Sequence, residues 1–119
     1  MRKNEVSMKI LSRPEELILL AVLFLKDNAY GVTIRDYIIQ KTAMDWTVGA
    51  VYVPLDRLAK AGFLNTTIGE PTAERGGKRK KFYTLTSRGY KSLASARRIH
   101  DAMWAPVSSL DWESSKGTK

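Results

Sequence analysis

A short cationic segment is the part of the sequence whose chemistry is easiest to interpret. Five of the seven residues from position 75 to 81 carry a positive charge: Arg75, Lys78, Arg79, Lys80 and Lys81. Guanidinium and ammonium groups at this density bind phosphate oxygens, so a polyanionic partner is expected. The usual alternative is a solvated charged loop that needs no partner. The preceding sequence favours phosphate contact, because it predicts a helix of the size that fits a DNA groove.

That helix is expected from about Val48 to Ala61. Thr47 is a good N-cap, and Gly62 can end the helix in the left-handed conformation while Phe63 folds back on it. The inward positions recur at spacings of four and three: Val51, Leu55 and Leu58. Pro54 lies inside the helix and removes one amide donor. The sequence leaves open whether this is a kink imposed by packing or a bend that aims the helix.

The early exposed positions of this helix carry small side chains and one tyrosine. Gly49 and Ala50 allow a phosphate or a base edge to approach closely, and the N-terminal amides attract phosphate. The hydroxyl of Tyr52 can bond phosphate, although an amphipathic core aromatic is an equal alternative. Thr47 is expected mainly as the N-cap of this helix, and its hydroxyl can also make a weak DNA contact. Because no Arg, Asn or Gln lies in the first two turns, we expect modest base readout and a large backbone and shape component.

Two further helices are expected before this one. The stretch Ser12-Arg13-Pro14-Glu15 has a capping serine, an early proline and a glutamate at the capping-box position, which predicts a helix up to about Lys26. This helix is apolar on nearly every side, so part of its cover is expected from a second subunit. A second helix is expected at about 31–42. The short turn at 43–46 then makes a helix-turn-helix.

A hairpin and a long helix are expected after it. Strands are predicted at 64–69 and 82–85, and the cationic residues are expected on the glycine-containing loop between them. Thr86 caps the last helix, which Pro106 should kink or end near Ala105. His100, Met103 and Trp104 lie close together on this helix. They predict an apolar dimer seam or, as the alternative, a candidate effector pocket for a small planar apolar ligand.

Composition limits the function further. The chain of 119 residues is expected to be one domain with a net charge of +8 and a pI of about 9.9, which suits an anionic partner. It has no cysteine and one histidine, which excludes disulfides and thiolate zinc sites and argues against a metal centre. With scattered carboxylates and no phosphate-binding glycine motif, we expect no enzyme and no cofactor. The longest apolar run, Leu17–Leu25, is too short to span a bilayer, so a cytoplasmic protein is expected.

The predicted fold class is mainly α with a small β-hairpin, a winged helix-turn-helix with a long C-terminal dimerisation helix. The expected organisation has four parts: a flexible basic arm at 1–11, the winged helix-turn-helix at 12–88, the dimerisation helix at 89–112 and a disordered tail at 113–119.

Several stretches taken together resemble the PadR family of transcriptional regulators, over about Leu17–Gly89. The resemblance is carried by Tyr30-Gly31, Val48-Gly49-Ala50-Val51-Tyr52, Leu55 with Arg57-Leu58, Gly62-Phe63-Leu64, Gly69-Glu70-Pro71, Arg75-Gly76-Gly77-Lys78-Arg79-Lys80 and Tyr83-Thr84-Leu85-Thr86. It implies a dimeric winged-helix repressor that binds double-stranded DNA. The helix at 48–61 would lie in the major groove and the hairpin on the backbone, and the first and last helices would build the homodimer.

The resemblance also assigns individual residues. Tyr52 matches a tyrosine of the family's recognition helix, and Lys78, Arg79 and Lys80 match the basic run of the wing. The chain is similar to the short subfamily, some members of which bind flat drugs between subunits through a tryptophan on the last helix. That position is His100 here, with Trp104 one turn further on. Related sequences often have proline directly after the tyrosine, where this chain has Val53.

The leading hypothesis is therefore a homodimeric, sequence-specific DNA-binding repressor. In one version of this hypothesis a small planar ligand relieves the repression, and in the other there is no ligand. The two recognition helices of the dimer would lie about 34–36 Å apart on a pseudo-palindromic site. The alternative is a winged-helix protein-interaction module without specific DNA binding. A membrane-surface role is a distant third, because no amphipathic apolar face adjoins the basic loop.

Overall fold

The computed structural model describes residues 10–71 and 79–107 of the chain. The elements in these ranges follow in the order α2 (Arg13–Leu25), the short 3-10 helix η1 (Lys26–Asn28), α3 (Gly31–Thr42), α4 (Val48–Lys60), β1 (Leu64–Pro71), β2 (Arg79–Leu85) and α5 (Ser87–Trp104). The mainly helical class with one antiparallel hairpin is confirmed. Most of the expected N-terminal arm, the hairpin tip with Arg75 and Lys78, and the expected tail lie outside the described residues.

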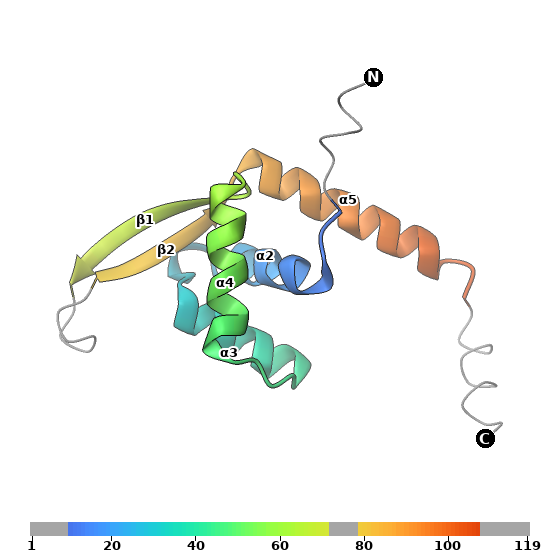
Figure 1. Cartoon of the computed structure of the whole chain (residues 1–119). Helices are drawn as coiled ribbons and strands as arrows, with labels where there is room; N and C mark the ends of the chain where they lie inside the picture. Colours follow the sequence, from blue (N-terminus) through green and yellow to red (C-terminus); the bar gives the residue numbers. More distant parts are fainter. Residues whose placement is uncertain (1–9, 72–78, 108–119) are drawn as a thin grey trace.

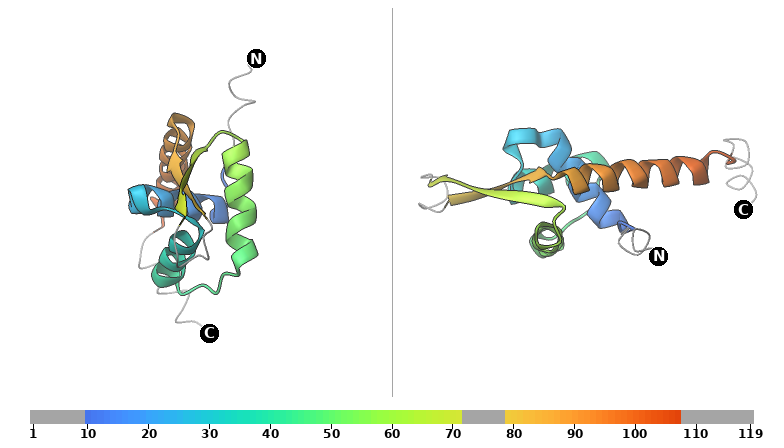
Figure 2. Two further views of the ribbon diagram at one scale, coloured as in Figure 1. Left: turned by 90° about the vertical axis from the view of Figure 1, so that its left-hand side faces the viewer. Right: turned by 90° about the horizontal axis from the view of Figure 1, so that it is seen from above.

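Helix α2 lies at the centre, and α3, α4, α5 and strand β2 all pack against it. The hairpin extends away on one side of this cluster and α5 on the other (Figure 1). Helix α4 stands out on one face, where the view from above looks along its axis (Figure 2). The fold therefore presents a helix and an extended hairpin beside each other, with a long helix leading away from both.

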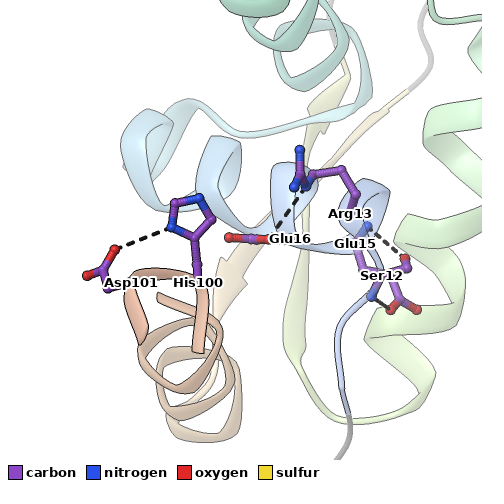
Figure 3. Close-up of polar contacts among 6 residues, drawn as sticks. All are labelled: Ser12, Arg13, Glu15, Glu16, His100 and Asp101. Carbon is purple, nitrogen blue, oxygen red and sulfur yellow. Dashed lines mark hydrogen bonds and ion pairs between the residues drawn. The ribbon is translucent and has the colours of Figure 1, made fainter. Parts of the chain in front are cut away.

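The start of α2 has the expected capping box and a further tie to α4. The Ser12 hydroxyl accepts from the amide of Glu15 at 3.2 Å, and a Glu15 carboxylate oxygen accepts from the amide of Ser12 at 2.8 Å (Figure 3). Glu15 is buried, and its second carboxylate oxygen lies 3.9 Å from the Arg57 guanidinium of α4. One carboxylate thus closes the helix end and joins two helices.

The end of α4 forms the expected Schellman motif. Gly62 has a φ of +87°, and the amide of Phe63 donates to the carbonyl of Leu58 at 2.9 Å. The Thr86 hydroxyl, which caps α5 by accepting from Gly89, donates to the Gly62 carbonyl at 2.7 Å. The end of α4 is therefore attached directly to the start of α5.

The core contains the inward residues that helical spacing predicts. Val51, Leu55 and Leu58 of α4 are almost completely buried, as are Ile34 and Ile38 of α3. Spacing alone does not predict two other core residues, Ala29 and Trp46, because they lie in the segments between helices. Pro54 is also buried, and α4 continues through it to Lys60.

The hairpin is longer than the sequence suggests. The sequence predicts Arg79, Lys80 and Lys81 on a loop, and this expectation is wrong, because they lie on β2. Pairing continues through Ile68 with Lys81 and, after a bulge, through Pro71 with Arg79. Strand hydrogen bonds come from the backbone, and long cationic side chains are well tolerated on a ribbon open to water. The charge run is therefore divided between two faces of a strand.

A third backbone segment joins the hairpin at its β2 edge. Tyr30 forms an isolated bridge with Phe82, and the amide of Tyr83 donates to the carbonyl of Ala29 at 2.9 Å. The Tyr30 and Phe82 rings pack edge to face with centroids 5.4 Å apart. These contacts fix the hairpin against the start of α3.

Large apolar side chains remain exposed on α2 and α5. Leu20, Leu23 and Phe24 of α2 are 42%, 38% and 61% exposed, and Phe24 is covered in part by the Tyr37 ring of α3, so the described chain covers this side of the helix only partly. On α5, Leu93 is buried, but Met103 and Trp104 are 72% and 52% exposed. Helix α5 ends at Trp104, near the predicted boundary. Among the described residues, no helix is both long and apolar enough to cross a membrane.

Candidate nucleic-acid interface

The connection between α3 and α4 determines how α4 is presented. Ala43 ends α3 in the left-handed conformation, with a φ of 59°. From within α3, the Nε of Arg35 donates to the Trp46 carbonyl at 2.7 Å, just before α4 begins. The Thr47 hydroxyl then accepts from the amide of Ala50 at 3.1 Å. The helix-turn-helix is thus held at its turn by a side-chain contact and started by a cap.

The residues predicted at the start of α4 face away from the core. Thr47, Gly49 and Ala50 are exposed, and a methyl group added at Gly49 would meet no other atom within 4 Å. The N-terminal half of α4 therefore offers its amides and small side chains to any ligand that approaches this face.

Tyr52 lies over the backbone at the start of α3. A Cβ atom built on Gly31 would lie 1.8 Å from the Tyr52 hydroxyl oxygen and 2.0 Å from Cζ, so only glycine fits under the ring. Tyr52 is still 39% exposed. Burial, with further contributions from Tyr52 and Asp56, raises the pKa of Tyr83 on the neighbouring strand. Tyr52 is thus a packed aromatic residue with an exposed portion, and its contact with phosphate stays a prediction.

Strand β2 provides the cations of the wing within the described residues. Arg79 and Lys81 are exposed, whereas Lys80 is half-buried with its ammonium 4.5 Å from the centroid of the Tyr30 ring. This alternation follows from the strand geometry, in which neighbouring side chains point to opposite faces. The structure therefore separates Lys80 from Arg79 and Lys81, which the sequence treats as one run.

The cations of α4 itself have carboxylate partners. Besides the contact of Arg57 with Glu15, the Lys60 ammonium lies 3.1 Å from the Asp56 carboxylate. Both cationic side chains remain well exposed, at 60% and 78%. Only the pair of Lys60 with Asp56 is exposed on both sides, because Glu15 is buried. Such an exposed pair is weak, so Lys60 can also contact an anionic ligand.

A second candidate site lies between the start of α2 and α5. His100, Met103 and Trp104 line a cavity of about 480 Å³ there, together with Ile10 and Glu16 among others. Figure 3 shows His100 of α5 opposite Glu16 of α2. The His100 and Trp104 rings lie 6.1 Å apart. The three residues predicted for an effector pocket thus do share one cavity, but its lining is mixed in polarity.

His100, which lines this cavity, also belongs to a small polar network on α5. His100 Nδ1 lies 3.3 Å from one Asp101 carboxylate oxygen, and Arg97 donates to the other at 3.0 Å. The contacts with His100 and then Arg97 lower the pKa of the Asp101 carboxyl. In the described part of the chain, no group of His, Asp and Glu side chains is arranged to hold a metal ion.

Residues 19–95 match the transcriptional regulator PadR-like family. The chain belongs to this family. The matched range includes the helix-turn-helix, the hairpin and the first half of α5. PadR-like regulators bind DNA and control transcription, so the exposed face of α4 and the wing are the natural candidates for the DNA contact.

Solved structures agree with the PadR assignment. A PadR-like transcription factor from Bacteroides fragilis is 26% identical, with a TM-score of 0.65 over 78% of this chain and 84% of that one. A PadR-like transcriptional regulator from Bacillus cereus is 20% identical, with a TM-score of 0.62 over 87% of this chain and 91% of that one. A PadR family regulator from Clostridium difficile is 21% identical, with a TM-score of 0.55 over 81% and 92% of the two chains. No curated protein is similar enough to be counted as a relative.

Two residues that position this PadR-like surface are not recognised by sequence reasoning. Gly31 makes room for the Tyr52 ring. In the sequence, Gly31 is noticed only as part of the Tyr30-Gly31 pair that contributes to the family resemblance, and the pair alone does not reveal this role. Arg57 joins α4 to α2 through its contact with Glu15. In the sequence, Arg57 is noticed only as part of the Arg57-Leu58 pair that contributes to the family resemblance. In both cases the role depends on a contact between elements that no local pattern reveals.

The contact between Gly31 and Tyr52 leads to a stability prediction. Gly31→Ala should lower the free energy of unfolding by about 1–3 kcal/mol, because the Tyr52 ring must leave its place. In a Tyr52→Ala background the same change should be neutral or slightly stabilising, since alanine favours a helix more than glycine does. Urea denaturation of the four proteins of this double-mutant cycle, at one fixed protein concentration, measures the free energies of unfolding.

Tyr52→Phe is the matched control for this cycle. The phenylalanine ring still places Cζ 2.0 Å from the new Cβ, so most of the Gly31→Ala penalty should remain. An equal penalty in the Tyr52→Ala and wild-type backgrounds would show that the ring does not pack on Gly31.

Proposed function

We propose that this PadR-like protein is a homodimeric, sequence-specific repressor of transcription. The observation that carries the proposal is the exposed N-terminal half of α4 beside a hairpin strand with exposed cations. A single helix fits the major groove of DNA, and its N-terminal residues are the ones that reach the base edges. A regulator of this kind acts on the chromosome, so the cytoplasm remains the expected compartment.

The wing would contact the sugar–phosphate backbone beside that groove. Arg79 and Lys81 are exposed on β2, and Lys78 and Arg75 precede them in the sequence, outside the described residues. Such contacts position the protein on the duplex without reading its sequence. The same contacts release counterions, so they should dominate the salt dependence of binding.

The exposed apolar side chains of α2 and α5 support the proposed homodimer. Leu20, Leu23 and Phe24 on α2 and Met103 on α5 leave large hydrophobic surfaces open in the single chain. Surfaces of this kind on a small domain mark sites of association. A symmetric pair would bury them and would place the two α4 helices for neighbouring turns of the duplex.

Removing charge from the wing tests the backbone contact. The triple variant with Lys78→Ala, Arg79→Ala and Lys81→Ala should bind every duplex more weakly, by about 10-fold or more at low salt. The slope of log affinity against log salt should flatten by roughly one unit for each phosphate contact that is lost. Fluorescence anisotropy on labelled duplexes over a salt series measures both quantities.

Lys91→Ala, which removes an exposed charge from α5, is the control and should leave both quantities nearly unchanged. A triple variant with wild-type affinity at moderate salt would refute the contact. A wild-type protein with weak binding and a shallow slope on all duplexes would instead favour the alternative, a winged-helix module that binds another protein.

Charge placed on the apolar faces tests the dimer. Leu20→Glu with Met103→Glu should convert the dimer to a chain of 13.4 kDa, because two carboxylates would have to be buried at the seam. Size-exclusion chromatography with light scattering gives the mass. Val32→Glu on α3, where the side chain is 46% exposed, should leave the dimer intact. A wild-type monomer, or a double variant that stays dimeric, would contradict the assignment.

The cavity between α2 and α5 supports a further part of the proposal, relief of repression by a small planar ligand. Trp104 is exposed there beside Met103, so an aromatic ring can stack on it. Planar aromatic dyes should quench tryptophan emission and weaken DNA binding, and Trp104→Phe should lose most of the quenching. Trp46, which is only 6% exposed, provides the unquenched background. An absence of quenching across a broad panel of dyes would remove this ligand role.

A further inference from the structure

A broad apolar groove of about 720 Å³ runs along one flank of α4. Met44 and Trp46 from the turn before α4 form part of its wall, and Ala50, Val53 and Pro54 line the helix side. The groove lies on the exposed flank of α4, the helix that the proposed function puts into the major groove. A ligand that approaches α4 along this flank therefore meets an apolar surface.

Val53 is the prominent residue of this surface. Its side chain is 59% exposed, and it lies one turn after Gly49, where an added methyl group would meet nothing. Because residues four apart share a face of a helix, Gly49 and Val53 present one outward strip, with Ala50 beside it. None of these three side chains carries a hydrogen-bonding group.

The cations of the wing favour a nucleic acid as the partner that covers the groove. The charges at the groove itself are balanced, because Asp45 lines it together with the exposed guanidinium of Arg57, and Lys60 is paired with Asp56. The net positive charge near α4 comes from the exposed cations of β2, Arg79 and Lys81. This arrangement complements an anionic partner that also offers apolar groups.

The major groove of DNA offers one apolar group, the C5-methyl of thymine. We infer that α4 recognises thymine methyl groups through this strip and that Val53 is the residue that sets the preference. The inference rests on the proposed function, because it requires α4 to lie in the major groove. A guanine at the same position would present hydrogen-bond acceptors to side chains that have no donor, so these side chains would not favour guanine.

Replacing thymine by uracil removes this methyl group and nothing else. Binding sites are first selected with the wild-type protein from a library of random duplexes. Each thymine of the selected site is then replaced in turn by deoxyuridine, and the affinity is measured. At the thymines under α4 the loss should be about fourfold for each methyl group, the value expected for one buried methylene. When the same thymine is replaced in both half-sites, the fold-loss of affinity should be the square of the loss for one half-site.

Variants at position 53 assign the effect to this residue. Val53→Ala should abolish most of the uracil penalty, and Val53→Ile should keep it. Val32→Ala is the matched control, because Val32 is 46% exposed on α3 and does not line the groove, so its uracil profile should match the wild type. Circular dichroism confirms that each variant remains folded.

The possible results are separable. Selective binding with no uracil penalty, or with a penalty that persists in Val53→Ala, overturns the inference and leaves the proposed function standing. Absence of selective binding to any duplex overturns both. A penalty that disappears with Val53→Ala alone supports the assignment.

Discussion

Burial of one stripe of α4 determines what the rest of the molecule can present. Val51, Leu55 and Leu58 are nearly inaccessible, so the opposite side of the helix must face outward. At 3.6 residues per turn, that side includes Gly49 and Val53. The core thus selects the residues that can contact a ligand, and any substitution that rotated this stripe would replace the whole surface.

Several contacts fix the position of α4 relative to its neighbours. Glu15 and Arg57 join it to α2, Arg35 holds the turn before it, and Gly62 and Thr86 attach its end to α5. Each is a single polar contact, but together they act at the start, the middle and the end of the helix. A helix held in this way can meet DNA without first being ordered, which avoids an entropic penalty on binding.

Local sequence patterns predict the helices and their ends because the physics involved is local. Ser12, Thr47 and Thr86 satisfy amides three residues away, and Gly62 adopts its left-handed conformation within one turn. The extent of the hairpin is a different matter. The pairing beyond Ile68 depends on a partner strand and a bulge, and a cluster of lysines looks like a loop when the strand opposite is not considered. The packing of Tyr52 on Gly31 is equally non-local.

In the proposed DNA complex, affinity and specificity would come from two different elements. The cations of α4, Arg57 and Lys60, lie close to carboxylates, so part of their charge is already compensated. The cations of β2, Arg79 and Lys81, are exposed, so in the proposed complex they could contact phosphates of any sequence. Attraction to the DNA backbone would then be concentrated in the wing. Helix α4, with an apolar strip and few donors, would contribute little to general affinity, and its contacts would differ between one base pair and another.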